Sequence, residues 1–539
     1  MEKQILFTPN GQNRTPEIVE ALRNASDGTE LIFFPGIYDF YAEGAYEGYF
    51  CPVCNRSGDK RVIFPMLRLN DVTINGAGAK FIFHDRVFPF IVQGCRNVTL
   101  RDFSIDFSFV RCLEGSIEEC SDDGFLLKLD PERCAYCVNE YGNLLLQAGC
   151  EVFSSSERRY FIEQRNWHCF VAVGDIYYDI VNPPADVIYC DAEIRDNGVY
   201  LRYRPESVKA QFVPGRKVML NYDELRENDV IFLDSSENVK LSHVRILHGA
   251  GMGIVGQLCE NVELDHVKVA PEDDGLYSTT ADAIMLINCS GKVRLDHVHV
   301  DRSVDDAVCI MGYYAQIERI TDRSKAVARL MHPSQSGANL FLKGDCLRIW
   351  DGKTLSETGS ITVKRSYMRD DMSMLFLEFE EEIIECLKPG DYLENPGRAP
   401  EIEITNSVFE NFPGIRLASE KKLVFKGNEV RNCCGVLVDD LLEYWYEGGF
   451  ITDMEIENNL FENMKNAVWV FIARPGESDA MHRNITVRAN RFVNCECAVD
   501  ASQTDGLTVC GNILSDVGQP MKISKCRNVT SDMPYTIVE

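Results

Sequence analysis

Short runs that alternate apolar and polar residues recur along most of this chain, and each run is closed by Asn, Gly or Asp. The segments 238–246 (NVKLSHVRI), 261–269 (NVELDHVKV) and 292–300 (KVRLDHVHV) repeat one pattern. Alternation bounded by turn residues is typical of β-strands, whereas a helical repeat would show apolar residues three and four positions apart. The central apolar positions of the three repeats are Val244, Val267 and Val298.

The C-terminal third carries the same theme in TNSVFEN, FKGNEVRN, IENNLFEN, VRANRFVN and VCGNILSD, spaced 21 to 31 residues apart. Near the N-terminus, NVTLRDFSI places Phe103 in the position of the valines. A period just above twenty residues, lengthened in some repeats by a loop of about eight, is typical of one coil of a parallel β-helix. We therefore predict an all-β fold, a right-handed parallel β-helix. The C-terminal core positions expected to align with the valines are Phe409, Val430, Phe461, Phe492 and Leu514.

An amphipathic segment near the N-terminus is suited to close the open end of this stack. In RTPEIVEALRNA, Thr15 is a candidate N-cap, and Pro16 occupies the first helical position. Ile18, Val19 and Leu22 share one face of the expected helix. We expect that face to pack on the core.

The repeat is interrupted twice, from Phe103 to Val244 and from Val298 to Phe409, by more residues than one coil needs. Both intervening segments are rich in β-branched and aromatic residues, and one contains DAEIRDNGVYLRYR, a hairpin pattern with DNG at its turn. We predict two small antiparallel, barrel-like β modules inserted into the helix. The predicted regions are 1–107 (cap and first coils), 108–228 (first module), 229–312 (coils with an acidic cluster), 313–398 (second module) and 399–539 (C-terminal coils).

Aspartates stand at the start of two equivalent strands, in TTADAIMLI and SVDDAVCIM. Asp-Asp pairs occur five times in this acidic chain, so a pair alone indicates only a solvated turn, and its place in the coil must distinguish a functional one. Asp306 follows Val298 by 8 residues, and Asp282 follows Val267 by 15, of which seven fit a loop at PEDDGLYSTT. We expect Asp282 and Asp306 in the same position of adjacent coils, about 4.8 Å apart, with Asp305 beside them.

Three carboxylates this close cannot all ionise easily, so at least one should keep its proton near neutral pH. A protonated carboxyl beside an ionised one is what glycosidic cleavage requires, as an acid for the leaving oxygen and a base for water. Two alternatives stay open. One is a ladder of like residues that only ends strands, and the other is a calcium site, although no EF-hand spacing is present.

Histidines and cysteines recur without forming a clear metal motif. His243, His266 and His297 occupy one coil position, but no further ligand accompanies them at a fixed offset, which favours a packing ladder over zinc. The 21 cysteines of a chain without an export signal are mostly expected to be buried thiols. The pairs in CPVC (51–54) and CAYC (134–137) would make a four-thiolate zinc site only if the fold joined them. We expect no metal and no cofactor.

The net charge of −28 limits the partners. Nucleic acids bind clustered Lys and Arg, and a polyanionic substrate would need a local basic pocket, so a neutral oligosaccharide fits best. No apolar run of about 18 residues offers a membrane span, and the N-terminus lacks the apolar core of a secretory signal. We expect a cytoplasmic protein with no nucleic-acid or membrane partner. Whether it forms a homo-oligomer stays open.

Several motifs resemble glycoside hydrolase family 110, the α-1,3-galactosidases: GMGIVGQLCENVELDHVKV, TTADAIMLINCSGKVRLDHVHV, VDDAVCIMGYY, MHPSQSGANLFLKGD and DDLLEYWYEGGF. The resemblance extends from about residue 10 to about 520 and is densest from 230 to 315. It implies a β-helix with inserted β-barrel modules and hydrolysis with inversion at the anomeric carbon. Asp305 would be the general acid, and Asp282 and Asp306 would be candidates for the base, with an acid–base separation of roughly 6.5–9.5 Å.

Later motifs supply candidate substrate-binding residues. His332 and Gln335 in MHPSQSG are candidates to hold sugar hydroxyls. Trp445 and Glu447 in YWYEGG offer an aromatic platform and a bidentate acceptor for a pyranose. The leading hypothesis is therefore an inverting exo-α-galactosidase that removes terminal α-1,3-linked galactose.

Two other functions stay in competition with this hypothesis. A polygalacturonase-like hydrolase would also use three aspartates on a β-helix, but it needs cations for uronate carboxylates, and Arg302 and Arg319 are the nearest candidates. A non-catalytic carbohydrate-binding β-helix would show a flat, aromatic-lined surface and no perturbed carboxyl.

Overall fold

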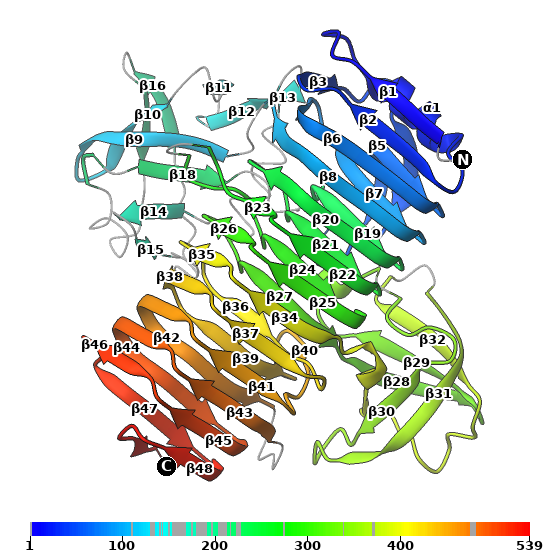
Figure 1. Ribbon diagram of the computed structural model, residues 1–539, viewed down its shortest axis with the longest axis vertical. Helices are drawn as coiled ribbons and strands as arrows, with labels where there is room; N and C mark the ends of the chain where they lie inside the picture. The colour runs from blue at the N-terminus through cyan, green and yellow to red at the C-terminus, as the bar shows by residue number, and fades with distance from the viewer. Residues whose placement is uncertain are drawn as a thin grey trace.

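The chain winds into a stack of coils, as the repeat predicted. The computed structural model describes residues 3–538, except 56, 273–274, 338, 369–371, 475–480 and several stretches between 109 and 227. Within the described residues, 33 strands form one continuous coiled sheet in which nearly all pairings are parallel. The colours of Figure 1 follow the sequence from one end of the stack to the other. The molecule is therefore a parallel β-helix.

One coil consists of three short strands joined by tight corners. β24 (Ile284–Ile287) is followed by β25 (Ser290–Asp296) and β26 (His299–Asp301), and the chain then enters the next coil at β27 (Val308–Tyr313). Each strand pairs in parallel with the same strand of the neighbouring coil, as β24 does with β27. The three faces of the helix are thus parallel sheets with about 4.8 Å between rungs.

One face, which we name the floor sheet, positions the candidate site. Its rungs are β5 (Gly58–Leu67), β7 (Phe88–Gln93), β19 (Ile231–Asp234), β21 (Ile254–Gln257), β24, β27, β36 (Ile415–Leu417), β39 (Val436–Leu441), β42 (Leu460–Ala473), β44 (Arg491–Ser502), β47 (Gln519–Ser524) and β49 (Thr536–Ile537).

The other two faces follow the same order along the stack. The second face consists of β6 (Asn70–Phe83), β8 (Arg96–Phe107), β20 (Glu237–Ile246), β22 (Glu260–Asp265), β25, β34 (Glu401–Thr405), β37 (Leu423–Lys426), β41 (Met454–Glu457), β43 (His482–Arg488), β45 (Thr504–Cys510) and β48 (Arg527–Ser531). The third uses the later parts of β6, β8 and β20, then β23 (Lys268–Val269), β26, β35 (Val408–Glu410), β38 (Glu429–Cys433), the first parts of β42 and β44, and β46 (Ile513–Ser515). The first coil adds β1 (Lys3–Phe7), β2 (Thr29–Phe33), β3 (Ile37–Phe40) and β4 (Tyr46–Phe50).

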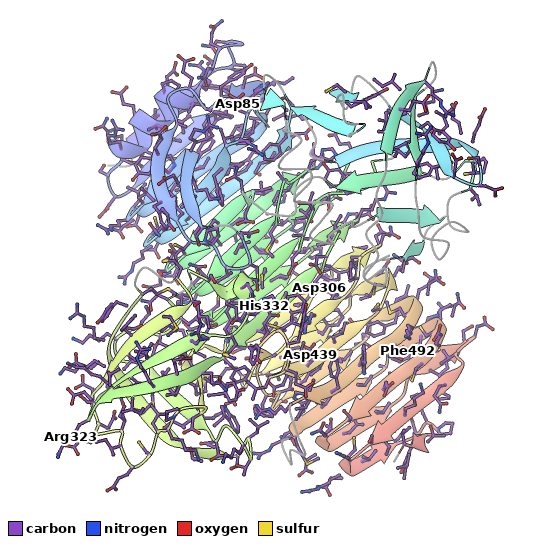
Figure 2. The ribbon with its side chains drawn as sticks, turned by 180° about the vertical axis from the view of Figure 1, so that it is seen from behind. Asp85, Asp306, Arg323, His332, Asp439 and Phe492 are labelled. Carbon is purple, nitrogen blue, oxygen red and sulfur yellow. The ribbon has the colours of Figure 1, made fainter. Side chains whose placement is uncertain are left out.

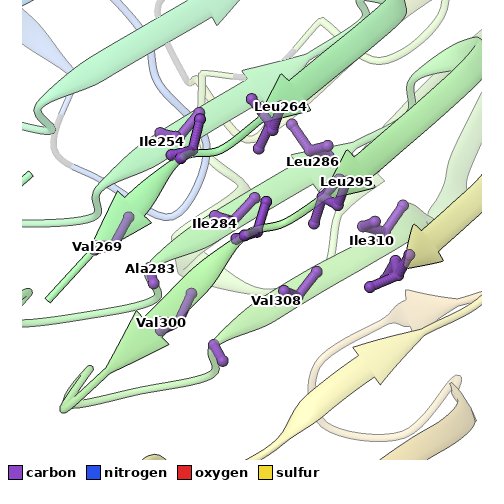
Figure 3. Close-up of a cluster of buried hydrophobic side chains, with 14 of the residues drawn as sticks. Ile254, Leu264, Val269, Ala283, Ile284, Leu286, Leu295, Val300, Val308 and Ile310 are labelled. Atoms are coloured by element: carbon purple, nitrogen blue, oxygen red, sulfur yellow. The ribbon is translucent and has the colours of Figure 1, made fainter. Parts of the chain in front are cut away.

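Inward side chains of the three faces form one continuous core. Ile284, Leu295, Val300 and Val308 are fully buried and lie in rows on successive rungs (Figure 3). Burial of each such side chain stabilises the fold by about 1.5–3 kcal/mol. This stabilisation depends on the neighbouring coils, because a single coil has nothing to cover its inward face.

Asparagines stack at the corners, which explains why so many repeats end in Asn. The backbone N–H of Asn459 donates to Oδ1 of Asn490 (2.9 Å), and the N–H of Asn490 donates to Oδ1 of Asn512 (2.9 Å). The side-chain amide of Asn490 also donates to the carbonyl of Ile456 (2.9 Å). These side chains satisfy backbone groups at places where the chain turns and sheet pairing stops.

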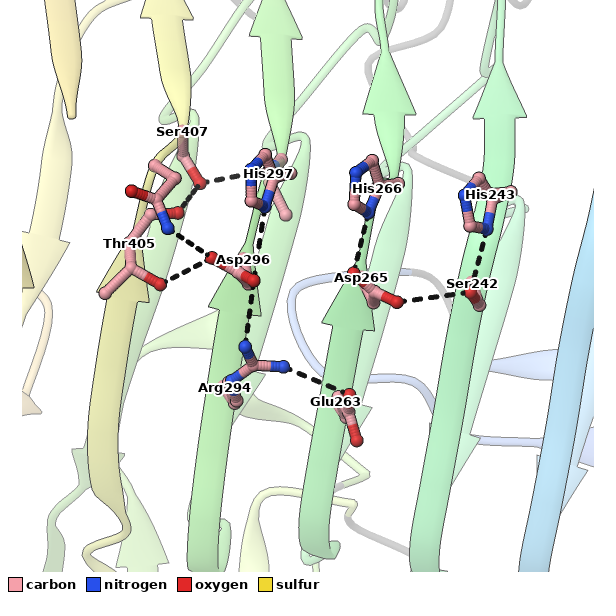
Figure 4. A network of polar contacts seen from close by, with 12 residues as sticks. Ser242, His243, Glu263, Asp265, His266, Arg294, Asp296, His297, Thr405 and Ser407 are labelled. Atoms are coloured by element: carbon pink, nitrogen blue, oxygen red, sulfur yellow. Dashed lines mark hydrogen bonds and ion pairs between the residues drawn. The ribbon is translucent and has the colours of Figure 1, made fainter. Parts of the chain in front are cut away.

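The three repeated histidines form the predicted packing ladder on an outer corner. The rings of His243 and His266 are 4.8 Å apart and those of His266 and His297 are 4.5 Å apart, with planes within 9° of parallel. All three residues have a left-handed backbone, with φ of 52° to 54°. Nδ1 of His266 lies 2.7 Å from Asp265, and Nδ1 of His297 lies 3.2 Å from Asp296 (Figure 4). The ladder is half-exposed and lies outside the core.

The strand registers correct one detail of the predicted alignment. Val244 lies beside Phe103 as expected, but Phe409 lies beside Val300 and not beside Val298. The C-terminal series of core positions is therefore displaced by two residues. A shift of two residues keeps inward side chains inward, because strand side chains alternate with a period of two. The apolar pattern alone could not reveal it.

Helix α1 (Thr15–Arg23) covers the N-terminal end of the stack, as predicted. Its N-cap is Arg14 and not Thr15, which is the first helical residue. The Thr15 hydroxyl donates to the carbonyl of Tyr41 (2.8 Å), so it is committed to the adjoining coil and does not cap the helix. The buried face consists of Thr15 and the three expected apolar residues, Ile18, Val19 and Leu22.

Antiparallel strands interrupt the helix in both predicted intervals, and the two groups lie on opposite sides of the stack in Figure 1. In the first, β16 (Asp191–Arg195) and β17 (Gly198–Arg202) pair as the predicted hairpin, whose two turn residues lie outside the described residues. The other described strands there are β9 (Cys112–Cys120), β10 (Gly124–Leu129), β11 (Ala135–Val138), β12 (Leu144–Ala148), β13 (Glu151–Val152), β14 (Cys169–Val173), β15 (Ile176–Tyr178) and β18 (Lys217–Asn221).

The exact limits of the five predicted regions stay predictions. The second interruption is a closed barrel. Its strands are β28 (Ala315–Asp322), β29 (Lys325–Leu330), β30 (Cys346–Trp350), β31 (Glu357–Met368), β32 (Met374–Phe379) and β33 (Tyr392–Glu394), closed in the order β28-β29-β32-β31-β30-β33.

The asparagine ladder predicts a large effect of one substitution. Asn490→Ala removes the acceptor of the Asn459 N–H and the donor to Ile456, leaving buried polar groups unsatisfied. We expect a loss of about 3 kcal/mol in the free energy of unfolding, measured by urea denaturation. Asn70→Ala, at an exposed asparagine that begins β6, is the control and should change stability little. Equal effects of both substitutions would contradict a structural role of the ladder.

Candidate active site

The turn that leads into the floor sheet carries the aspartates. β24 and β27 pair with Ile284 beside Val308, so Asp282 and Asp306 each stand two residues before equivalent positions. The backbone N–H of Ala283 donates to the carbonyl of Asp306 (2.9 Å). The two aspartates therefore occupy the same position on adjacent rungs, about 4.8 Å apart along the helix axis. This is the placement that the coil spacing predicted.

Asp305 adjoins this pair within the same turn. Its Oδ1 accepts the backbone N–H of Asp306 (3.1 Å). Asp282 is buried, whereas Asp305 and Asp306 are half-buried. Gly414 on the following rung leaves space for the Asp306 carboxylate, because a Cβ at that position would lie 3.1 Å from Oδ1 of Asp306.

Burial and like charges act together on the titration of Asp306. Burial raises the pKa of Asp306 well above its usual range, and the charges of Asp305 and Asp282 raise it further, while Arg416 opposes the rise. Neighbouring carboxylates that cannot all ionise titrate as a unit. The arrangement therefore favours a state in which one of the three keeps a proton.

An arginine that the sequence pattern did not single out faces this trio. Arg416 on β36 lies one rung beyond Cys309 of β27. Its Nε and Nη2 donate to Oδ2 of Asp439 (3.1 and 2.7 Å), and its Nη1 lies 3.7 Å from Glu447. Asp439 and Glu447 are buried. Asp439 belongs to one of the five Asp-Asp pairs, and only the rung register shows that this pair lies near the trio.

The site is therefore acidic, because the trio, Asp439 and Glu447 supply five carboxyl groups against the one guanidinium of Arg416. Neither arginine proposed for a uronate substrate changes this balance. Arg302 donates to the carbonyl of Gly275 (2.6 Å) and lies 3.6 Å from Asp301. Arg319 is exposed on barrel strand β28. An anionic sugar would meet a repulsive field beside Asp306.

A hairpin from the first coils covers the floor sheet on the N-terminal side of the aspartates. β4 and β5 pair as an antiparallel hairpin, and we name residues 51–55 and 57 its tip. The backbone N–H of Val53 donates to Oε1 of Gln257 on β21 (3.0 Å). The amide of Asn55 donates to Oδ1 of Asp229 (2.7 Å). Asp229 holds the same position as Asp282, two rungs earlier, so the tip covers the rungs that precede the acids.

The thiols of the tip are engaged in local contacts. Neither Cys51 nor Cys54 is in a disulfide, and Sγ of Cys54 lies 2.9 Å from the hydroxyl of Tyr313 on β27. Burial raises the pKa of Cys51. Cys134 of the second CxxC pair lies outside the described residues. Among the residues that the structure describes, no group of three or more His, Cys, Asp or Glu side chains is arranged to hold a metal ion.

Two loops, which carry His332 and Trp445, meet next to the end of β27 and form what we name the rim. The ring of His332 is 4.5 Å from that of Trp445, whose side chain is partly exposed. Gln335 is fully buried, and its amide donates to the carbonyls of Trp445 (2.9 Å) and Tyr446 (3.2 Å). In this structure Gln335 supports the loop and reaches no solvent, which corrects the expectation that it holds sugar hydroxyls. Figure 2 labels His332, Asp306 and Asp439 on the molecule seen from behind.

The structure positions Glu447 at the edge of the floor sheet. It begins β40 (Glu447–Gly448), which pairs antiparallel with the end of β27, so that Glu447 lies beside Tyr313.

None of the helices in the described parts of the chain is both long enough and apolar enough to cross a membrane.

Known proteins similar to this chain agree with its architecture. The family model described as "Right handed beta helix region" matches residues 360–514, in agreement with the predicted handedness. Alpha-1,3-galactosidase A of Shewanella woodyi is 26% identical over 543 residues, which cover 95% of this chain and 86% of that protein. Alpha-1,3-galactosidase B of Phocaeicola vulgatus is 27% identical over 487 residues, covering 85% of this chain and 77% of that protein.

A solved structure also aligns with nearly the whole chain. The family 28 exopolygalacturonase of Yersinia enterocolitica is 11% identical, with a TM-score of 0.41, and the alignment covers 98% of this chain and 78% of that one. A likeness at this level carries no conclusion about activity.

The raised pKa of Asp306 predicts that this residue destabilises the fold at neutral pH. Because the pKa of Asp306 is raised in the folded chain, the folded chain keeps this proton to a higher pH than the unfolded chain, which loses it above pH of about 4. Stability from this group is therefore fully present below that pH and is lost as pH rises through the folded pKa. Asp306→Asn stays neutral, so we expect its Tm to exceed that of the unmodified protein at pH 7, with a smaller gap at pH 4.

The matched control is Asp516→Asn, at an exposed aspartate with a left-handed backbone that Asn also tolerates. Its Tm should follow that of the unmodified protein at both pH values. A gap for Asp306→Asn that did not change between pH 4 and pH 7 would show that titration is not the cause.

Proposed function

We propose that this chain, a distant relative of the α-1,3-galactosidases, is an inverting exo-glycosidase that removes terminal α-1,3-linked galactose from neutral oligosaccharides. The observation that carries the proposal is the trio of Asp282, Asp305 and Asp306 on two adjacent rungs, with the pKa of Asp306 raised. Hydrolysis of an acetal needs one protonated and one ionised carboxyl at the same bond.

The proton of the trio supplies the acid step. The three carboxyls share this proton, and in the reactive state Asp305 holds it and donates it to the glycosidic oxygen as the bond from that oxygen to the anomeric carbon breaks. Asp282 or Asp306 removes a proton from a water that attacks the opposite face of that carbon. The product then has the inverted anomeric configuration. The acid–base separation predicted for this mechanism is roughly 6.5–9.5 Å, which leaves room for the water.

The covered floor sheet supports removal of one terminal sugar. The hairpin tip lies over the rungs before Asp282. Outward-facing Val255, Met285 and Cys309 on β21, β24 and β27 are buried. A glycan chain cannot continue over these rungs towards the N-terminal coils. The acids thus act at a closed end, where only the last residue of a chain fits.

The local charge supports a neutral substrate over a uronate. Arg416, the cation that acts on Asp306, already pairs with Asp439 and Glu447. We propose that Trp445, His332 and Glu447 contact the sugar at the rim, the first through its partly exposed indole. A polygalacturonase-like activity would instead need a free cation for each carboxylate of the substrate.

The substrate and stereochemistry are tested with α-1,3-galactobiose. The purified chain should release galactose, and NMR should detect the β-anomer first, because inversion converts the α-linkage. Polygalacturonate and neutral β-galactosides should not be cleaved. Cleavage of polygalacturonate alone would replace this proposal with the uronate alternative.

Two substrates that differ in their leaving group distinguish the roles of the acids. Asp305→Asn should slow hydrolysis of the disaccharide by about 10²–10⁴-fold. The same variant should retain far more activity on 2,4-dinitrophenyl α-galactoside, because that phenolate leaves without protonation. If Asp282 is the base, Asp282→Asn should lose activity on both substrates. The control Asp516→Asn should keep its activity on both. Equal losses of Asp305→Asn on both substrates would remove Asp305 from the acid role.

A further inference from the structure

The outer face of the floor sheet changes character at the acids. One outward position recurs on successive rungs as Val255, Met285, Cys309, Arg416, Leu437, Trp469, Asp500 and Lys522. The first three residues of this row are buried, whereas the row from Arg416 to Lys522 is half-buried. The row is therefore covered up to and including the rungs that carry the acids, and it is more open on the C-terminal side.

An aromatic pair lies on the open part of this face. Trp469 and Phe471 on β42 alternate with Val468 and Val470, which belong to the core, so both rings point outward. Their centroids are 4.6 Å apart. Both side chains are half-buried. Phe471 lies beside Asp439, the partner of Arg416, so the pair continues the same surface.

The spacing of the pair suits a sugar beyond the bond that is cleaved. Trp469 lies two rungs from Arg416 and three from Cys309, which is about 10 Å and about 14 Å along the helix axis. A terminal sugar beside the acids occupies the first part of this distance. The rest of an oligosaccharide has only the C-terminal direction available, because the hairpin tip covers the other.

We propose that Trp469, supported by Phe471, is a binding subsite for a neutral hexopyranose on the leaving-group side of the substrate. The apolar face of the ring would stack on the indole, a contact that needs no charge. The opposite charges of Asp500 and Lys522 on the next two rungs keep the end of the row near neutral. The inference rests on the proposed function only for the direction of the substrate and predicts a preference for longer oligosaccharides.

The test compares galactose-terminated oligosaccharides of two and four neutral hexoses. For the unmodified chain, kcat/KM should be higher for the tetrasaccharide. Trp469→Ala should lower the tetrasaccharide-to-disaccharide ratio of kcat/KM about tenfold, mainly through KM, and Trp469→Phe should restore most of the ratio. Phe34→Ala removes an exposed aromatic side chain near the N-terminal end of the stack and should leave the ratio unchanged.

Calorimetric binding to Asp305→Asn, which should turn over little substrate, separates this inference from the proposed function. The added substitution Trp469→Ala should weaken tetrasaccharide binding about tenfold. If the unmodified chain releases galactose but Trp469→Ala leaves the ratio and the binding unchanged, the subsite is refuted and the activity stands. If no galactoside is cleaved but Trp469 still determines binding, the proposed activity fails and the subsite stands. Absence of tetrasaccharide binding overturns the subsite.

Discussion

Backbone pairing between rungs is the interaction on which the rest of this molecule depends. Parallel hydrogen bonding holds neighbouring coils about 4.8 Å apart and aligns residues that are more than twenty positions apart in sequence. At most positions this alignment stabilises the fold, because apolar side chains cover one another and Asn490 satisfies the backbone of the coil before it. The same alignment places Asp282 beside Asp306, where like charges repel. A stabilising repeat thus becomes a reactive one when its residue is ionisable.

A positive charge on the next rung, that of Arg416, offsets part of the repulsion between these aspartates. Arg416 lowers the pKa of Asp306 but is itself held by Asp439 and Glu447, so the guanidinium is fixed before any ligand arrives. A fixed charge costs little reorganisation during a reaction. Removing one partner of a buried pair is expensive, of the order of 3–5 kcal/mol, so the group behaves as a unit.

A second buried charge network anchors the barrel beside the site. Asp440 faces away from Asp439 and accepts hydrogen bonds from Arg474 Nε (2.6 Å) and from the hydroxyl of Tyr314 (2.6 Å), the residue that precedes β28. The rings of Trp350 and Phe450 lie 4.5 and 4.7 Å from the Arg474 guanidinium. These contacts join the barrel to the end of the floor sheet. The first insertion returns to the helix at floor strand β19, and the second leaves it at the end of floor strand β27, so both border the sheet that carries the acids.

The sequence by itself determined the fold class, the capping helix and the shared position of Asp282 and Asp306. These features follow from local periodicity, because a strand shows its buried face in every second residue and a coil shows its length in the spacing of equivalent strands. The sequence could not distinguish a register from one displaced by two residues, so Phe409 was placed one inward position away from its true partner.

Only the tertiary structure decided which distant residues complete the site. In sequence, the whole barrel separates Arg416 and Asp439 from the three aspartates. No local pattern therefore predicts that these residues lie near one another. The hairpin tip meets Asp229 and Gln257 across some two hundred residues, and Gln335 turned inward to hold a loop. Periodicity specifies which way a side chain points on its own strand. Which other segment it then meets depends on where the chain returns after each insertion.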